Sequence, residues 1–120
     1  MIGVGYILLI MFIHWVSDFI FQTHEMSKKK SKSIYWLSLH VLTYSLITTM
    51  GWAAISLTPL ILLQVFVITF ITHWCTDFVT SKITSYLYLK GDIHNFFVVI
   101  GIDQFTHTTT LMLTYIHLVN

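Results

Sequence analysis

Four long apolar stretches constrain the fold of this chain more than any other feature of its sequence. They cover residues about 2–21, 34–57, 60–80 and 93–118. A helix needs about 20 apolar residues, each adding about 1.5 Å, to cross a hydrocarbon core of about 30 Å. Lipid offers the backbone no hydrogen bonds, so a single crossing segment must be helical. The pattern predicts an all-α protein in which residues 1–120 form one membrane domain with four transmembrane helices.

Charged side chains are scarce, and their number separates classes of protein. They make up 9% of the chain, against about 25% of an ordinary soluble domain, while hydrophobic residues make up 56%. A soluble domain this small exposes too much surface for so few charges to cover. The net charge of +1 gives little electrostatic basis for binding a phosphate backbone. We therefore expect membrane lipids as partners and no nucleic acid, and neither a soluble enzyme nor a disordered chain.

The lysines lie in only two of the connections between these stretches, and they predict the orientation of the chain. Those before the second stretch are Lys28, Lys29, Lys30 and Lys32, and those after the third are Lys82 and Lys90. Because positively charged loops stay in the cytoplasm, we expect a multi-pass protein of the bacterial inner membrane with both termini on the non-cytoplasmic side. The first group would contact anionic lipids or, alternatively, recruit an anionic substrate. A 14.0 kDa bundle could also assemble as a homo-oligomer.

A short motif occurs twice and indicates an internal repeat. Residues 14–19 read His-Trp-Val-Ser-Asp-Phe, and residues 73–78 read His-Trp-Cys-Thr-Asp-Phe. Both copies lie in stretches expected to run from the outside of the membrane to the inside. We therefore predict two helical hairpins in tandem, related by an axis along the membrane normal.

Three of the stretches carry a His and an Asp four residues apart, and the second stretch carries His40. The three pairs are His14 with Asp18, His73 with Asp77, and Asp103 with His107. Residues four apart share one face of a helix. Counting about 1.5 Å per residue from the cytoplasmic ends puts most of these side chains in the same half of the bilayer. Four helices therefore offer side chains of the metal-ligand type at compatible heights.

The three acids need compensation inside a membrane. An isolated carboxylate costs roughly 2.5–3.5 kcal/mol at the bilayer centre, and no lysine lies in any stretch. Carboxylate and imidazole together suit Zn²⁺, Mn²⁺ or Fe²⁺. We predict one metal, with the spare Asp residues orienting His rings, or two metals that share a bridging Asp. The alternatives are a metal-free proton or ion path and a polar network that only fixes helix packing.

A metal at this depth favours hydrolysis of a lipid-like or phosphoester substrate at the cytoplasmic leaflet. The metal would lower the pKa of a bound water, and Asp103 or Asp18 would act as the general base. The side chains expected to border the site or the substrate are Gln22, Lys32, Lys82 and Gln104. The competing classes are a proton or divalent-cation translocating protein and a non-catalytic membrane protein of a phage–host interaction. The outer halves of the first and third stretches are mostly apolar, which favours a closed pocket over a through-path.

The order of these motifs resembles a known family. The residues that carry the resemblance are His14, Trp15, Asp18, Phe19, Gln22, segments 26–28 and 30–33, His40, His73, Asp77, Lys82, Asp103, Gln104 and His107. Over nearly the whole chain they are similar to a small bacterial and phage membrane family catalogued as domain of unknown function 3307, which implies no established activity. The His-Asp spacing in apolar stretches also resembles the LexA-binding inner-membrane hydrolases, which implies metal-dependent hydrolysis.

Overall fold

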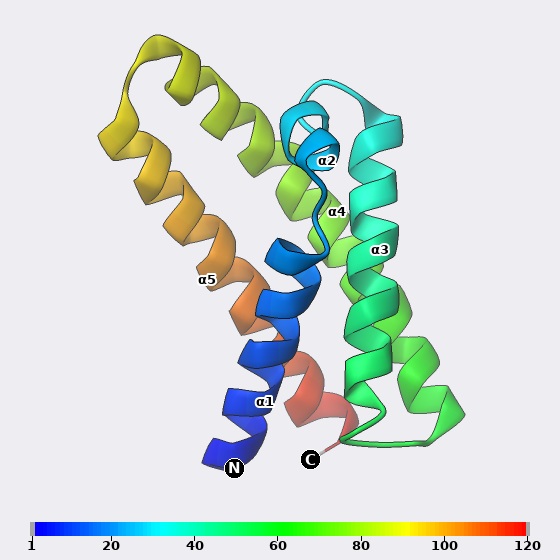
Figure 1. Cartoon of the computed structure of the whole chain (residues 1–120). Helices are drawn as coiled ribbons and strands as arrows, with labels where there is room; N and C mark the ends of the chain where they lie inside the picture. The colour runs from blue at the N-terminus through cyan, green and yellow to red at the C-terminus, as the bar shows by residue number, and fades with distance from the viewer. Residues whose placement is uncertain (1, 120) are drawn as a thin grey trace.

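The protein is a bundle of helices, described by a computed structural model over residues 2–119 (Figure 1). The elements in order are α1 Val4–Trp15, a π-helical turn η1 Val16–Ile20 that continues it, α2 His24–Lys29, α3 Ile34–Trp52, α4 Pro59–Lys90 and α5 Ile93–Leu118. The described residues contain no strand, which confirms the prediction of an all-α protein.

Local sequence signals account for the helix ends. Ser33 and Asp92 precede α3 and α5, and each side chain accepts a hydrogen bond from the backbone N–H three residues further on, which satisfies one of the unpaired donors of a first turn. Pro59 opens α4, where a missing N–H costs nothing. Gly91 ends α4 with a φ of 82°, a left-handed conformation that favours glycine.

The helix bounds differ from the apolar stretches at two places. The second stretch was expected to stay helical to residue 57, but α3 ends at Trp52, whose fully buried ring packs in the apolar core just before the chain turns towards Pro59. The third was expected to end at residue 80, but α4 continues to Lys90 because no Gly or Pro interrupts it before Gly91. The α4–α5 connection is therefore short, and Lys82 lies on a helix.

Within residues 2–119, two helices, α4 and α5, are long and apolar enough to cross a membrane by length and composition. The prediction of four such helices is corrected to two by this measure. The first apolar helix, Val4–Ile20, is shorter. The 19 residues of α3 include the buried polar side chains of His40, Ser45 and Thr48, which lower its apolar character.

The α4–α5 hairpin is the longest unit, and α1 and α3 pack along it. Helix α3 packs against α4, while α1 contacts α3 and α5, and α2 contacts α3. The start of α1, the end of α5 and the α3–α4 connection lie at one end, and α2 and the α4–α5 connection lie at the other (Figure 1). This arrangement agrees with two hairpins that point the same way.

Helices α1 and α3 approach each other closely at a glycine. A Cβ atom on Gly51 would lie 2.7 Å from Cγ2 of Ile13, a distance that real Cβ contacts do not show. Ile13 directly precedes His14 in the chain. The absence of a side chain at residue 51 therefore sets how near the first copy of the repeated motif comes to α3.

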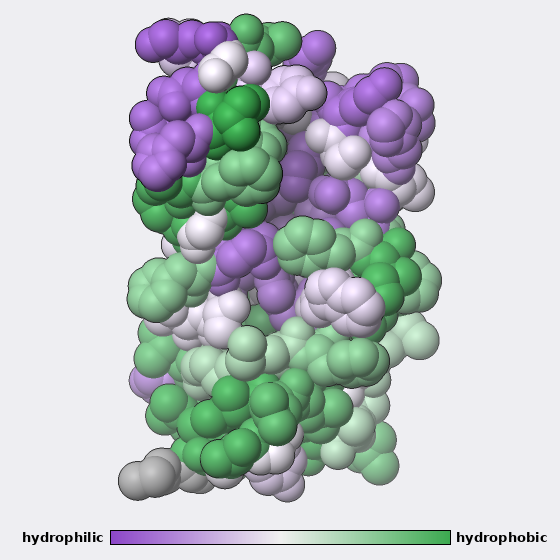
Figure 2. All heavy atoms as spheres, turned by 60° about the vertical axis from the view of Figure 1, so that its left-hand side comes forward, coloured by the Kyte–Doolittle hydropathy of each residue, from purple (hydrophilic) through white to green (hydrophobic). Residues whose placement is uncertain are grey.

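Polar side chains fill much of the interior, and apolar side chains cover much of the outside. Among the buried residues described, twelve are polar or charged and ten are hydrophobic. Many large apolar side chains are exposed, among them Val4, Leu57 and Phe105 at 71%, 78% and 72% exposure. Hydrophilic residues gather at the α2 end around a hollow, and hydrophobic residues cover the opposite end (Figure 2). The distribution is inverted with respect to a water-soluble domain.

Candidate metal centre

Four side chains converge where η1, α3 and α4 meet. They are Asp18, His40, His73 and Asp77, here called the inner tetrad, and each is at most 4% exposed. Nε2 of His40 lies 3.2 Å from Nε2 of His73, and 3.2 Å from both Oδ1 of Asp18 and Oδ2 of Asp77. Nε2 of His73 lies 3.4 Å and 3.3 Å from the same two oxygens. The tetrad thus brings together ligand candidates from η1 and α4 with the single His of α3.

These distances suit a tetrahedral metal ion. Ligand atoms about 2.0–2.2 Å from a tetrahedral Zn²⁺ lie roughly 3.3–3.6 Å from one another, close to the 3.2–3.4 Å found here. A neutral imidazole Nε2 holds at most one hydrogen, yet each Nε2 in the tetrad faces two carboxylate oxygens and the other ring. A cation at the centre satisfies all four atoms together, so the donor set fits a metal.

A second group of possible ligands adjoins the tetrad. Asp18, Asp103 and His107 each offer an atom within 4.8 Å of the others, and they are called the outer group. Nε2 of His107 lies 3.3 Å from Oδ1 of Asp103 and 3.0 Å from Oδ1 of Asp77. Asp18 is common to both groups, and the other oxygen of Asp77 belongs to the tetrad, so each of these carboxylates lies between the two groups. The geometry is therefore compatible with the one-metal arrangement and with the two-metal arrangement that shares a bridging Asp.

Of the seven ligand candidates, His14 is the one that belongs to neither group. Its Nδ1 lies 2.9 Å from the hydroxyl of Tyr44, its Nε2 lies 2.7 Å from Oε1 of Gln104, and Nε2 is 3.7 Å from Asp18. The amide oxygen of Gln104 accepts only, so Nε2 of His14 carries the proton in this arrangement. His14 is therefore placed beside the ligand groups, where it orients their neighbours.

Hydrogen bonds and stacking hold the ligand groups in position. The amide of Gln104 donates to Asp18 at 3.3 Å and to Asp103 at 3.0 Å, and the hydroxyl of Thr80 donates to Asp103. The ring of His73 is stacked between the rings of Tyr44 and His107, whose centres lie 3.8 Å and 3.9 Å from its own. Nδ1 of His73 is buried without a partner, so stacking takes the orienting role that a hydrogen bond plays for most ligand imidazoles.

Lys30 contacts the candidate site, and the sequence analysis did not single it out. It follows α2, its side chain is largely buried, and its Nζ lies 2.9 Å from Oδ2 of Asp77, the oxygen that completes the tetrad. Burial disfavours its charged form, but attraction by Asp77 and Asp18 outweighs that effect and raises the pKa of Lys30 above its ordinary value. No pattern could distinguish Lys30 from the lysines beside it, because only the packing of α2 selects the one that reaches inwards.

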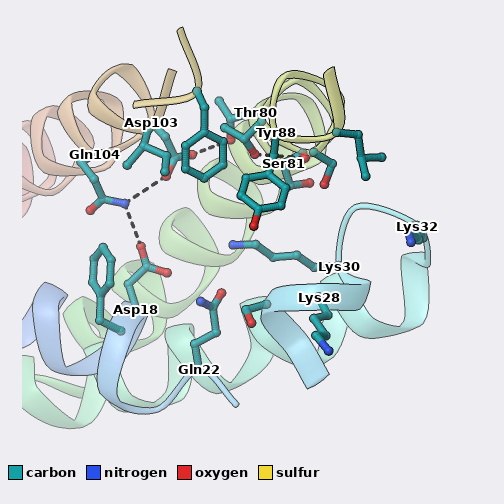
Figure 3. Close-up of a pocket in the computed structure, with 17 residues that line it drawn as sticks. Asp18, Gln22, Lys28, Lys30, Lys32, Thr80, Ser81, Tyr88, Asp103 and Gln104 are labelled. Carbon is teal, nitrogen blue, oxygen red and sulfur yellow. Dashed lines mark hydrogen bonds between the residues drawn. The ribbon is translucent and has the colours of Figure 1, made fainter. Parts of the chain in front are cut away.

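A cavity of about 710 Å³ opens beside the candidate metal centre, between the lysine segment (residues 28–32) and the α4–α5 tip (Figure 3). Asp18, Asp103 and Gln104 line its inner end. Its lining also includes Gln22, Ser81, Lys28, Lys30 and Lys32. The ammonium group of Lys30 extends into this space between the two sides of the cavity, whereas Lys28 and Lys32 lie towards its edge (Figure 3).

Three of the four residues expected to border the site do line this cavity: Gln22, Lys32 and Gln104. Lys82 does not. Its Nζ donates to the carbonyl of Ser31 at 3.2 Å and lies 4.2 Å from the ring centre of Phe78. The reason is that residue 82 still lies within α4. The side chain of Lys82 therefore projects from a face of this helix that does not line the cavity.

The fold and the site define a class: an all-helical protein with a buried His/Asp group at metal-binding distances and two helices apolar enough to cross a membrane. The chain belongs to the DUF3307 family, proteins of unknown function, whose match covers residues 6–120. This finding confirms the family resemblance. No curated protein and no solved structure matches the chain, and the likeness to the LexA-binding hydrolases stays a resemblance.

Proposed function

We propose that this protein is a membrane-embedded divalent-metal protein that hydrolyses a phosphoester or lipid-like substrate at the cytoplasmic leaflet. The observation that supports it most is the inner tetrad, in which the two imidazole nitrogens lie 3.2–3.4 Å from each other and from two carboxylate oxygens, the separations of tetrahedral ligands. Zn²⁺ fits this donor set best, and Mn²⁺ and Fe²⁺ also bind imidazole and carboxylate.

The inverted surface supports insertion of the whole bundle. A continuous exposed apolar surface of this kind does not stay soluble, while buried polar side chains suit a bundle surrounded by lipid. The 12 residues of α1 and five of η1 would span about 25 Å, and the 19 residues of α3 about 28 Å. Both lengths are close to a hydrocarbon core of about 30 Å, so α1 with η1 and α3 would lie in the membrane beside the two helices that are long and apolar enough to cross it, with the lysines on the cytoplasmic side.

The length of α4 supports a location of the cavity at the membrane surface. Its 32 residues would span about 48 Å, well beyond the hydrocarbon core. The excess lies at the end near Lys90 and therefore projects into the cytoplasm. Its residues Tyr88 and Leu89 form part of one wall of the cavity. A substrate would reach the metal centre from the inner leaflet or from the cytoplasm.

Asp103 is the better of the two candidate bases. A divalent metal at the tetrad supplies Lewis-acid activation of water near neutral pH. Both carboxylates line the cavity, but Asp18 has one oxygen in the tetrad, whereas Asp103 lies outside it and faces His107 and Gln104. We therefore assign Asp103 to accept a proton during hydrolysis and Asp18 to hold the metal.

A translocation path is disfavoured by packing at the far end of the bundle. Beyond the metal centre lies an apolar cluster made by Ile10, Ile13, Trp52, Val65, Leu111 and Tyr115. Four of its members, Ile10, Trp52, Val65 and Leu111, are at most 2% exposed. Buried hydroxyls of Ser45, Thr48 and Thr69 lie on that side of the centre, but the cluster beyond them offers an ion no charged side chain, which supports a closed pocket.

The metal assignment is tested by elemental analysis of the protein purified in detergent. Wild type should hold at least one equivalent of a divalent metal, and His73→Ala and Asp77→Asn should hold almost none. His117→Ala is the matched control, because that histidine is exposed and bonds only a carbonyl of its own helix, that of Leu113. Equal, negligible metal in wild type and all variants would refute the proposal.

Hydrolysis is tested separately with a chromogenic phosphodiester and a short-chain phospholipid as substrates. Asp103→Asn keeps a side chain of the same shape, so it should retain the metal and lose about 100-fold or more in turnover, as expected for loss of a general base. A variant that keeps both metal and full turnover would remove Asp103 from the reaction. Turnover that survives complete metal removal would contradict metal-dependent hydrolysis.

A further inference from the structure

We propose that the cavity beside the metal centre is a binding site for a phosphate group, and that it becomes competent only when a metal takes Asp77 away from Lys30. This inference rests on the proposed metal site and adds its ligand and its control. The ligand is a phosphate monoester group, carried by either a lipid or a soluble compound.

Oδ2 of Asp77 can bind either Lys30 or a metal in the tetrad. Oδ2 of Asp77 lies 2.9 Å from Nζ of Lys30, while the same oxygen lies 3.2 Å and 3.3 Å from the imidazole nitrogens of the tetrad. A metal in the tetrad would coordinate this oxygen and repel the ammonium group. The stem of lysine is long and flexible, so the ammonium group can swing into the adjoining cavity, which Lys30 already lines.

A metal would also change the charge at the inner end of the cavity. Without a metal, the carboxylates of Asp18 and Asp103 line this end, and Lys30 is engaged by Asp77. An anion would be repelled there. A divalent metal offsets two negative charges and at the same time releases a positive one, so the same space changes from repelling to attracting a phosphate.

The cavity also has a possible hydrogen-bond donor with no partner among the described residues. The hydroxyl of Ser81 is buried and unpaired, and Ser81 lines the cavity. A buried polar atom left unpaired is costly. Ser81 lies four residues after Asp77 on α4, so its hydroxyl and the released ammonium would face the same ligand.

The size and lining of the cavity bear on the rest of the ligand. At about 710 Å³ the cavity is far larger than a phosphate ion and falls in the range of small-molecule sites, about 300–1,000 Å³. Apolar side chains of Phe19, Leu89, Phe96 and Ile100 form part of its wall. The phosphate would therefore belong to a larger molecule with an apolar part.

The experiment measures phosphate binding to the detergent-purified protein with and without Zn²⁺. The probes are methylphosphonate and dihexanoyl phosphatidic acid, and binding is followed by phosphorus NMR. Zn²⁺ binding is measured first on its own with a chromophoric chelator. In wild type, Zn²⁺ should strengthen phosphonate binding by about tenfold or more, the worth of one charge-assisted hydrogen bond.

Lys30→Met and Lys29→Met form a matched pair, since both lysines lie in the same segment, only Lys30 bonds Asp77, and Lys29 pairs with Glu25 outside the cavity lining. Lys30→Met should bind Zn²⁺ more tightly than wild type, because no ammonium competes for Asp77, and should lose most of the coupling. Lys29→Met should keep wild-type Zn²⁺ affinity and coupling. Ser81→Ala should weaken phosphonate binding while leaving Zn²⁺ affinity unchanged.

The outcomes separate this inference from the proposed function. No Zn²⁺ binding by wild type would overturn both. Normal Zn²⁺ binding, with phosphonate affinity that is equal with and without the metal or with full coupling in Lys30→Met, would overturn the inference alone. Tighter binding of the lipid than of methylphosphonate assigns the site to a lipid headgroup, and equal affinities assign it to a soluble phosphate compound. Either result, with the coupling present, supports the phosphate site.

Discussion

The two copies of the repeated motif have nearly the same residues and different structures. In the second copy, residues 73–78 lie within the unbroken α4, and Nε2 of His73 is 3.3 Å from Oδ2 of Asp77. In the first copy, the helix widens into the π-helical turn Val16–Ile20 between the histidine and the end of the motif. Nε2 of His14 is 3.7 Å from Asp18, whose other carboxylate oxygen faces His40 and His73.

The wider turn gives the two copies different roles. Both acids reach the inner tetrad, but only one motif histidine does, and His40 of α3 takes the remaining place. A π-turn inserts an extra residue per turn and re-aims the side chains that follow it. The first copy also ends its helix at Ile20 and leads into the lysine segment, whereas α4 continues to Lys90 and walls the cavity. A sequence repeat therefore does not imply equivalent ligands.

The largest expected effect is a difference between the two motif histidines. His73→Ala should reduce Zn²⁺ affinity to background, because it removes a tetrad atom. His14→Ala should cost only about 10–100-fold, the usual effect of a residue that supports a ligand. Competition with a chromophoric chelator measures both. An equal loss in the two variants would show that the copies are equivalent after all.

A smaller effect is expected from filling the close approach that positions the first copy. Gly51→Ala pushes a methyl group against Ile13 and should destabilise the protein by about 1–3 kcal/mol, measured by chemical unfolding in detergent. Gly101→Ala is the control, because a Cβ atom there meets nothing within 4 Å. That variant should be neutral or slightly more stable, since alanine favours a helix. If Gly51→Ala were harmless, the contact would not position the motif.

The next effect concerns Gln104, whose side chain links the ligand groups to His14 of the first motif copy. Gln104→Ala removes hydrogen bonds to His14, Asp18 and Asp103, and should lower Zn²⁺ affinity by about tenfold. Gln104→Glu places a carboxylate among carboxylates and should bind Zn²⁺ differently from Gln104→Ala. Wild-type affinity in Gln104→Ala would mean that these acids are held by the helices alone.

The smallest effect is expected at the start of the π-turn. The hydroxyl of Ser17 donates to the carbonyl of Ile13 at 2.7 Å, and Ser17→Ala should lower the free energy of unfolding by about 0.5–1 kcal/mol. Ser27→Ala removes a comparable bond to His24 on the exposed surface of α2 and should change it much less. Equal changes in the two variants would deprive the buried bond of any special part in shaping the turn.

Much of the site could be predicted from spacing alone. Residues four apart share a helical face whatever the tertiary structure is, so the pairs Asp77 with His73 and Asp103 with His107 followed directly from the sequence. Their common height followed from the alternation of the helices. The position of Thr84, Ser85, Tyr88 and Leu89 beside the cavity could not be predicted, because α4 was expected to end at residue 80.

By itself, the sequence determined that the chain is all-helical, that its acids and histidines share helix faces, and that it belongs to the DUF3307 family. These properties depend on local hydrogen bonding and periodicity. Only the tertiary structure decided that His40 and His73, but not His14, complete the tetrad, and that Lys30 reaches Asp77 across 47 residues of chain. The physical reason is that helix rotation, a single π-turn and the docking of α2 are set by packing between distant segments, which no local pattern encodes.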